Sequence, residues 1–334
     1  MHYKIAEHSI DDIITSWVSA MNQPAQGVTI GNNPILPSVI HQSWGWPVIF
    51  IEFHFDSHLL AVASFVKIRK NWVSLPHFDH DSLWVDLNYL KEHFKKWNSD
   101  HSDFPGDIYR VFYSRAGEVL MGINGILDAG VVISVRLESV DLIKPAAEIT
   151  GLKAKQILAR NRYPVMPFSD RSKIIPELAL PEQYEILFNR YSSNVRRKIR
   201  KAGKNGILIE SGGRELVDDF YLVYRKNIRE MGSFALPKTF FEHLLSAYRF
   251  GNACIFLARM NDRVVGGSVL LTFSGNAENA WFATLHDYNR FYVSYALHDA
   301  MIRFSVENGC RIYSFGRSTA GSSGHRYKQQ WGTT

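Results

Sequence analysis

The chain has 334 residues, of which 46% are hydrophobic and 13% are aromatic. This composition is typical of a packed globular protein and excludes an intrinsically disordered one, and the length fits two domains of roughly 150 residues each. The formal net charge of +6 is modest for this length and does not by itself indicate nucleic-acid binding.

Two cysteines, Cys254 and Cys310, are too few for a disulfide framework, which predicts a reducing compartment and therefore a cytoplasmic location. The N-terminus has no apolar stretch of the kind found in signal peptides. Residues 119–135 are the most apolar run, but Asn124, Asp128 and three glycines interrupt it. Because about 20 uninterrupted apolar residues are needed to cross a bilayer, we expect no transmembrane segment.

The first half of the chain predicts both helices and strands. A capping-box pattern at Ser9 precedes apolar residues at helical spacing, which predicts a helix up to about Met21. Residues 48–55 and 59–67 flank a short polar turn and are rich in β-branched and aromatic side chains, as in a β-hairpin. A further helix is expected at residues 83–97, with strands at 108–113 and 131–137.

Two clusters in this half allow a functional and a structural interpretation. The segment HQSWGW at residues 41–46 can line a groove or supply buried aromatic side chains. His77, Asp79, His80 and Asp81 crowd together, but no further group with metal-ligand spacing appears elsewhere. We therefore expect no metal site.

Four prolines after residue 160 interrupt the pattern, and we place the domain boundary near Phe168, giving domains at residues 1–168 and 169–334. Apolar residues at three- and four-residue steps then predict one helix from Tyr184 to Gly203. Gly266-Gly267 lies inside an expected strand and favours a bulge or close packing over a cofactor site. The other expected elements are helices at 214–230, 237–248 and 293–304, and strands at 253–259, 264–273, 280–285 and 311–315.

The helix that stops at Gly203 carries a basic face. With about 100° per residue, five cations cover an arc of about 140° opposite Val195 and Ala202. These cations are Arg196, Arg197, Arg200, Lys201 and Lys204. The face is either a solvated helix surface or a surface for phosphates on a substrate or on RNA, although few aromatics are interleaved for stacking of single-stranded bases.

Near the C-terminus, an expected strand runs into a Gly/Ser loop that Arg317 and Lys328 flank. Small residues let a backbone pass close to a ligand, and the two cations can hold an anion. An ordinary connection between elements is the alternative interpretation.

Three segments of the second half resemble the Fem-type (FemA/FemB) peptidyl and aminoacyl transferases, and most of all their relatives beside exosortase and exopolysaccharide systems. They are SNVRRKIRKAGKNG at 193–206, FYLVYRKNIREMGSFALPKTFFEHLL at 220–245 and YSFGRSTAGSSGHRYKQQWG at 313–332. SLPHFD at 74–79 fits a weaker signature of the first domain. The resemblance implies two tandem acetyltransferase-like (GNAT) α+β domains, with mixed sheets flanked by helices and the active cleft mainly in the second.

This resemblance implies N-acyl or aminoacyl transfer to an amino group of a cell-envelope or exopolysaccharide precursor. The donor would be acyl-CoA or aminoacyl-tRNA, so RNA is a partner only if tRNA carries the acyl group, and no metal is required. Amine attack on an activated carbonyl needs positioning and a donor for the oxyanion, but no enzyme nucleophile.

The resemblance also implies roles for particular residues. Lys328 matches the lysine of the family's Phe-Lys motif at the reacting centre. Tyr327 stands in place of the phenylalanine and would contact the substrate. Arg317 matches the arginine after the preceding strand and would clamp an anion. An exposed lysine and a surface ion pair are the alternatives. The substrate phosphates would be bound by Arg196, Arg197 and Arg200.

In acetyltransferases of this fold, coenzyme A pyrophosphate sits on a Gly-rich turn before a helix. Here the matching turn, HDYNRFY at residues 286–292, has no glycine, which argues against standard acetyl-CoA binding. His286 could accept a proton, and Tyr288, Asn289 and Arg290 could contact substrate, unless they are only polar loop residues.

Two departures from the family open an alternative function. The chain has no coiled-coil insertion between Gly206 and Pro237, and it ends at Thr334, where relatives continue. A catalytically lapsed GNAT-like module that binds an anionic glycan precursor or partner is therefore the second hypothesis.

Overall fold

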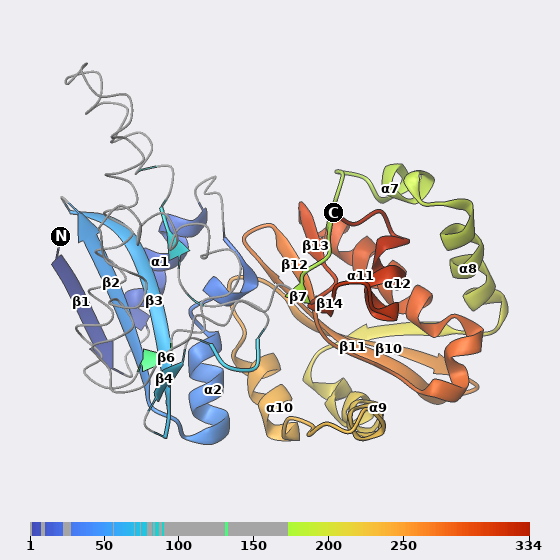
Figure 1. Ribbon diagram of the computed structural model, residues 1–334, viewed down its shortest axis with the longest axis horizontal. Coiled ribbons are helices and arrows are strands. Elements are labelled where there is room, and N and C mark those ends of the chain that lie inside the picture. Colours follow the sequence, from blue (N-terminus) through green and yellow to red (C-terminus); the bar gives the residue numbers. More distant parts are fainter. Residues whose placement is uncertain are drawn as a thin grey trace, which may run out of the picture. The chain divides into compact units, whose positions relative to one another are not determined.

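The fold was analysed in a computed structural model of the chain. It describes residues 2–7, 11–22, 28–55, 57–69, 71–73, 75–78, 82, 84–86, 89, 131–132 and 173–334. The chain divides into two compact units, Met1–Ser169 and Asp170–Thr334, and each unit is described by itself (Figure 1). No helix within these ranges combines the length and the apolarity needed to span a bilayer.

The first unit contains a six-stranded sheet in the order β1-β2-β3-β4-β6, with β5 paired to β3. All described pairs are antiparallel except β4 with β6. The strands are β1 (His2–Glu7), β2 (Val48–Phe55), β3 (His58–Ile68), β4 (Asn71–Val73), β5 (Trp84–Val85) and β6 (Val131–Val132). The helices are α1 (Asp11–Asn22), η1 (Ile30–Asn32) and α2 (Leu36–Trp44).

The expected first helix and the expected hairpin are found as α1 and as β2 with β3. Trp84–Val85, by contrast, pair as a strand where a helix was expected to begin. Trp84 is only 2% exposed, so sheet packing decides its conformation over helical spacing. Apart from Asp86 and Tyr89, the rest of that expected helix lies outside the described residues, as does the expected strand at 108–113.

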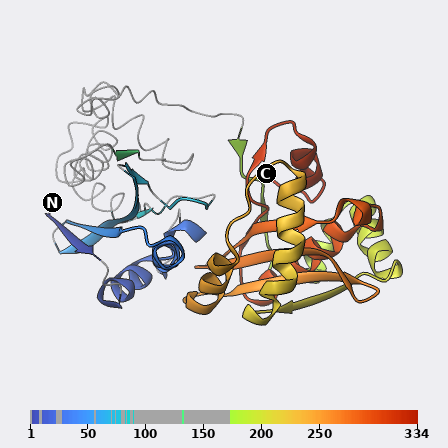
Figure 2. The same cartoon turned by 90° about the horizontal axis from the view of Figure 1, so that it is seen from below.

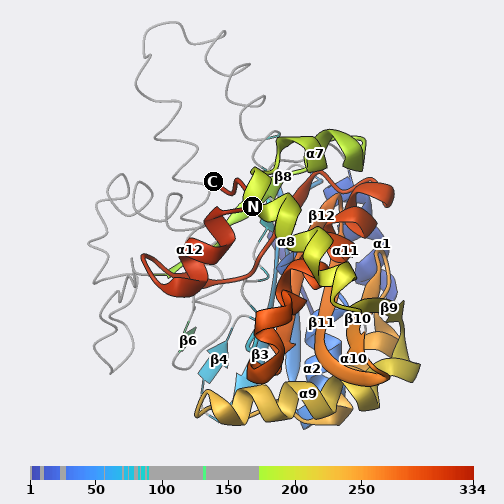
Figure 3. The same ribbon diagram turned by 90° about the vertical axis from the view of Figure 1, so that its right-hand side faces the viewer.

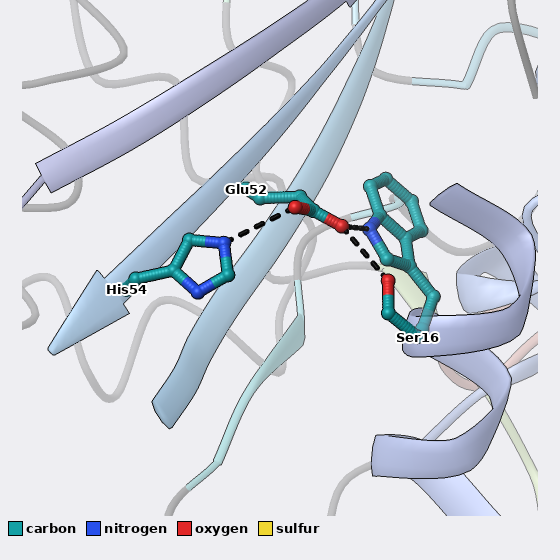
Figure 4. Close-up of polar contacts among 4 residues, drawn as sticks. Ser16, Glu52 and His54 are labelled. Atoms are coloured by element: carbon teal, nitrogen blue, oxygen red, sulfur yellow. Dashed lines mark hydrogen bonds and ion pairs between the residues drawn. The ribbon is translucent and has the colours of Figure 1, made fainter. Parts of the chain in front are cut away.

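A buried carboxylate ties α1 to the sheet of the first unit (Figure 4). Glu52 on β2 is 7% exposed. One of its oxygens accepts hydrogen bonds from Trp17 Nε1 at 2.8 Å and Ser16 Oγ at 3.0 Å, and the other lies 3.1 Å from His54 Nε2. A buried charge is costly unless donors surround it. Because Ser16 donates to the carboxylate and not to the imidazole, the group anchors the helix and does not activate a serine nucleophile.

The second unit contains a six-stranded sheet in the order β8-β13-β12-β11-β10-β9, in which only β12 and β13 pair in parallel. A two-stranded sheet joins β7 to β14. The strands are β7 (Lys173–Ile174), β8 (Glu177–Ala179), β9 (Leu208–Gly212), β10 (Ala253–Met260), β11 (Arg263–Phe273), β12 (Asn276–Thr284), β13 (Ile312–Ser314) and β14 (Ser318–Thr319). The helices are α7 (Tyr184–Arg190), α8 (Ser193–Lys204), η2 (Arg214–Leu216), α9 (Val217–Glu230), α10 (Lys238–Ala247), η3 (His286–Phe291), α11 (Val293–Glu307) and α12 (Ser323–Gln329).

Helices cover both faces of this sheet (Figure 2 and Figure 3). Two consecutive glycines of β11 mark the closest approach. A Cβ atom on Gly266 would meet Val293 and Leu297 of α11, whereas one on Gly267 would meet Phe220 of α9. Because successive residues of a strand point to opposite faces, α11 and α9 lie on opposite sides of β11. The pair serves close packing, as the sequence indicated.

The helix expected from Tyr184 to Gly203 is two helices, α7 and α8. Tyr191 leaves the helical conformation with ψ of 145°, and its buried ring packs edge-on against Trp331 at 5.2 Å between centroids. Ser192 then caps α8, because its hydroxyl accepts a hydrogen bond from the Val195 amide. The apolar spacing continues across this break, which is why periodicity alone predicts one helix.

Gly266→Ala should destabilise the second unit by about 1–3 kcal/mol, because overpacked side chains must move. The new Cβ would lie 2.7 Å from Val293 Cγ1 and 3.1 Å from Leu297 Cδ1. Urea unfolding followed by circular dichroism measures the change. Gly203→Ala is the matched control: in α8 the added Cβ meets nothing within 4 Å, so stability should rise by about 0.5–1 kcal/mol. Equal stability of Gly266→Ala and the wild type would contradict the packing argument.

Candidate active site in the second unit

The central sheet of the second unit opens between β12 and β13. The two strands pair over three positions only, from Asn276 with Ile312 to Glu278 with Ser314. β12 continues to Thr284, and a register shift opposite Val269 and Leu270 adds one residue to it at this point. Bulges are common beside active sites, where they redirect a strand. The residues around this opening are therefore the first place to look for a site.

A buried histidine fills the space beside the opening. His298 on α11 is 2% exposed, and its Nδ1 shares a hydrogen bond of 2.9 Å with the Tyr313 hydroxyl. Its ring stacks on Phe282 of β12 at 4.7 Å and tilts against Phe315 at the same distance. Burial and the nearby charge of Lys328 lower the pKa of His298 well below its ordinary value. The imidazole is therefore neutral at physiological pH.

Lys328 lies on α12, a helix within the segment that the sequence suggested was a loop. Ser322 caps this helix by accepting a hydrogen bond of 3.1 Å from the His325 amide. The Lys328 ammonium donates to the carbonyl oxygens of Gly316 at 2.7 Å and Arg317 at 3.2 Å. The structure thus brings Lys328 and the backbone of Arg317 together directly after β13, and the Arg317 side chain is exposed.

Tyr327, the neighbour of Lys328, faces the protein interior. Its ring packs edge-on against Tyr295 at 5.1 Å and lies 5.8 Å from His298. Burial raises the pKa of its hydroxyl well above the ordinary value. Tyr327 therefore holds α12 against α11, and its hydroxyl stays protonated.

Sequence reasoning missed Lys198. This side chain turns inward from α8, and its ammonium donates to the Tyr295 hydroxyl at 2.8 Å and to Gln330 Oε1 at 3.1 Å. It also lies 4.7 Å above the Tyr295 ring. Lys198 follows Val195 by three residues and therefore falls about 60° from the buried stripe on a helical projection. This angle was the signal in the sequence that its side chain could point inward. Lys198 links α8, α11 and the end of α12.

The predicted phosphate-binding arginines do not share the side of α8 that carries Lys198. They lie on the opposite side of the helix or on its outer surface. Arg196 donates to the Asn189 carbonyl of α7 at 2.8 Å, and Arg200 lies 5.6 Å from the Phe188 ring. Arg197 donates to Asn194 at 2.8 Å. Within the described part of the chain, no hydrogen bond or ring contact joins these arginines to Lys328. In the part of the chain that the structure describes, the cations of the basic face of α8 form no ion pair with a carboxylate.

The predicted residues before α11 lie on η3. His286, Asn289 and Arg290 are exposed, and Tyr288 is half-buried beneath the Arg263 guanidinium at 5.5 Å. The amides of Tyr288 and Tyr292 donate to carbonyls within the turn, and Tyr292 adopts a left-handed φ of 66°. These two amides are therefore not available to a pyrophosphate, in agreement with the missing glycine.

The lowered pKa of His298 predicts a pH dependence of stability. Because the unfolded chain titrates near the ordinary histidine value of about 6.5, it binds the extra proton first as the pH falls. The free energy of unfolding should then decrease below that pH, by at most about 1.4 kcal/mol per unit. His298→Gln should remove this part of the slope. Urea unfolding between neutral and mildly acidic pH measures it, and parallel slopes in the two proteins would contradict a neutral imidazole.

Comparison with known proteins identifies the domain in which this site lies. Residues 189–329 match the family described as the Acetyltransferase (GNAT) domain. No curated protein matches the chain. Among solved structures, the chain is similar to FemX, with 12% identity, 99% of this chain and 94% of that chain covered and a TM-score of 0.66. It is also similar to a tandem GNAT protein from the clavulanic acid biosynthesis pathway, with 9% identity, 99% and 95% covered and a TM-score of 0.52.

These similarities establish the fold. The matched domain contains α8, the β12–β13 opening, His298 and Lys328. The likeness to FemX and to the tandem GNAT protein extends over nearly the whole chain. The chain therefore has the tandem GNAT α+β fold, and residues 189–329 of its second unit match the GNAT domain family.

Proposed function

We propose that the protein is an N-acyltransferase or aminoacyltransferase that acts on an amino group of a cell-envelope or exopolysaccharide precursor. The observation that carries this proposal is that the Lys328 ammonium, from α12, reaches the carbonyl oxygens of Gly316 and Arg317 directly after β13, where the sheet opens. The fold shared with FemX supports transfer to an amine.

The reaction makes one bond and breaks another. The neutral amine attacks the carbonyl carbon, a C–N bond forms, and the donor's C–S or C–O bond breaks after a negatively charged oxygen has developed. Lys328 and Arg317 supply positive charge for that oxygen or for a substrate phosphate. The carbonyl double bond then forms again, and the leaving group departs with the electron pair of the broken C–S or C–O bond.

The amine must also lose a proton, and the two histidines suit this task differently. His298 resists protonation because it is buried beside a cation, so it is a weak base. We assign it the support of Tyr313 and α12. His286 is exposed on η3 and keeps the role of candidate proton acceptor, with Tyr288, Asn289 and Arg290 as candidate substrate contacts.

The donor remains acyl-CoA or aminoacyl-tRNA, held differently from standard acetyl-CoA. The engaged amides of η3 argue against pyrophosphate binding at that turn. The outward face of α8 offers cations without carboxylate partners among the described residues, which suits a donor or acceptor that carries phosphates. Arg196, Arg197 and Arg200 would contact those phosphates.

The engaged turn also favours the second candidate function, a catalytically lapsed module that binds an anionic glycan precursor. A thermal-shift screen with acyl-CoAs, aminoacyl-tRNA and nucleotide-sugar precursors separates the two, when it is followed by mass spectrometry of the mixtures. Ligand binding with no transferred acyl group from any donor would support the lapsed module.

Lys328→Ala and Arg317→Ala should each reduce turnover about 10²–10³-fold, the usual effect of removing one donor to a developing oxyanion. Initial rates with the substrate pair found in the screen measure this. Arg225→Ala removes an exposed cation of α9 and should keep the wild-type rate. Near-normal rates in both site variants would remove this site assignment.

A variant with glutamine at Arg197, Arg200 and Lys201 should bind a phosphate-rich substrate more weakly and with less dependence on salt. Each lost phosphate contact lowers the slope of log affinity against log salt by about 0.7–0.9. Binding titrations at several salt concentrations give the slope. Replacing the exposed Arg225 and Lys226 of α9 by glutamine is the control, and equal slopes in the two variants would show that α8 does not contact phosphates.

A further inference from the structure

Three aromatic rings of the first unit lie against one another near its surface. The centroids of Trp44 and Trp46 are 5.2 Å apart with an interplanar angle of 14°. His77 lies 4.9 Å from Trp44 and 6.1 Å from Trp46, at 26° and 23°. In a single column with about 3.5 Å between planes, the outer rings would be about 7 Å apart. All three distances are shorter, so Trp46 and His77 lie side by side on Trp44. We call these three residues the aromatic platform.

The end of α2 builds one half of the aromatic platform. Gly45 ends the helix in the left-handed conformation with φ of 68°, and its amide donates to the His41 carbonyl at 2.7 Å. This reversal brings the residues before and after Gly45 onto one side. His41 Nδ1 also lies 2.8 Å from the Trp46 carbonyl oxygen. The two tryptophans are therefore held by their own backbone.

The other half is presented by a strained turn. His77 has φ of 74°, and Leu75 has φ of 36°, a conformation that costs energy for residues with a side chain. Leu75 is fully buried and Phe78 is 4% exposed, whereas His77 between them is exposed. The neighbours thus anchor the turn, and the imidazole is left at the surface against Trp44.

The aromatic platform is not part of the hydrophobic core. Trp44 and Trp46 are half-buried, and the largest fully buried side chains of this unit are others, among them Trp17 and Trp84. Desolvation lowers the pKa of His77, so the imidazole is neutral at physiological pH. Gln42, two residues before Trp44, is exposed. Lys67 is also exposed, and its backbone amide donates to the carbonyl of Pro47, directly after Trp46.

We propose that the aromatic platform binds the apolar face of a pyranose ring in a glycan. The C–H groups on that face carry partial positive charge and suit the negative faces of aromatic rings. The hydroxyl groups at the edge of the sugar meet polar side chains such as Gln42 and Lys67. The partly exposed rings of Trp46 and His77 fit a ring that is apolar on its face and polar at its edge. The choice of a glycan rests on the proposed function, in which the acceptor is a glycan or envelope precursor.

Tryptophan fluorescence of the full chain tests the proposal without any transfer reaction. The probes are the N-acetylglucosamine tetramer and cellotetraose, with UMP as the nucleobase probe. At least one sugar should produce a saturable change of emission. Trp46→Ala and His77→Ala should each weaken that binding at least about tenfold, equivalent to about 1.4 kcal/mol. Far-ultraviolet circular dichroism establishes that each variant is folded, and His77→Ala carries the test if Trp46→Ala does not fold.

Phe234→Ala is the matched control, because this ring is 98% exposed in the other unit and its loss should leave sugar binding unchanged. Absence of a saturable change with both sugars would overturn the proposal, as would undiminished binding in folded His77→Ala. Binding of UMP alone, lost in the same variants, would reassign the aromatic platform to nucleobases. Because no turnover is measured, these results stand apart from the rates of the Lys328 and Arg317 variants.

Discussion

The second unit depends on one constraint in its sheet: β12 pairs with β13 over only three positions and then continues alone on that side. The separation leaves room that side chains must fill, and His298 with its surrounding aromatic rings does so. The same separation lets the chain after β13 turn back through Gly316 and present carbonyl oxygens to Lys328. The bulge in β12, the buried histidine and the position of α12 are thus consequences of one change in strand pairing.

Around this opening, cations are held by neutral oxygens. The Lys198 ammonium is bound by a tyrosine hydroxyl and a glutamine carbonyl, and the Lys328 ammonium by two backbone carbonyls. Such partners fix the position of each ammonium group at this opening. Two ammonium groups held in fixed positions at this opening support the proposal of a substrate that carries phosphate or develops an oxyanion.

Sequence periodicity was sufficient for most elements but not for the site. Helical spacing and turn residues predicted α1, α9, α10 and α11, and the tandem GNAT fold followed from the resemblance. The break at Tyr191 was missed because the apolar spacing runs through it, and only the packing of that ring on Trp331 explains it. Lys198 was missed because a projection gives an angle but not the reach of a side chain toward Tyr295. Whether Lys328 lies near His298 depends on how the short helix α12 packs against α11, and no local sequence pattern predicts that packing.

The glycine pair of β11 has a mechanical consequence. At Gly266 and Gly267 the sheet is one backbone thick, and α11 and α9 touch it from opposite sides. α11 carries His298, and α9 holds the last carbonyl of β12 through the Asn227 side chain at 2.9 Å. Because packed interiors transmit strain, a displacement of α9 reaches α11 through this thin place. We therefore expect that a molecule which displaces one of these helices also shifts the helix on the other side of the sheet.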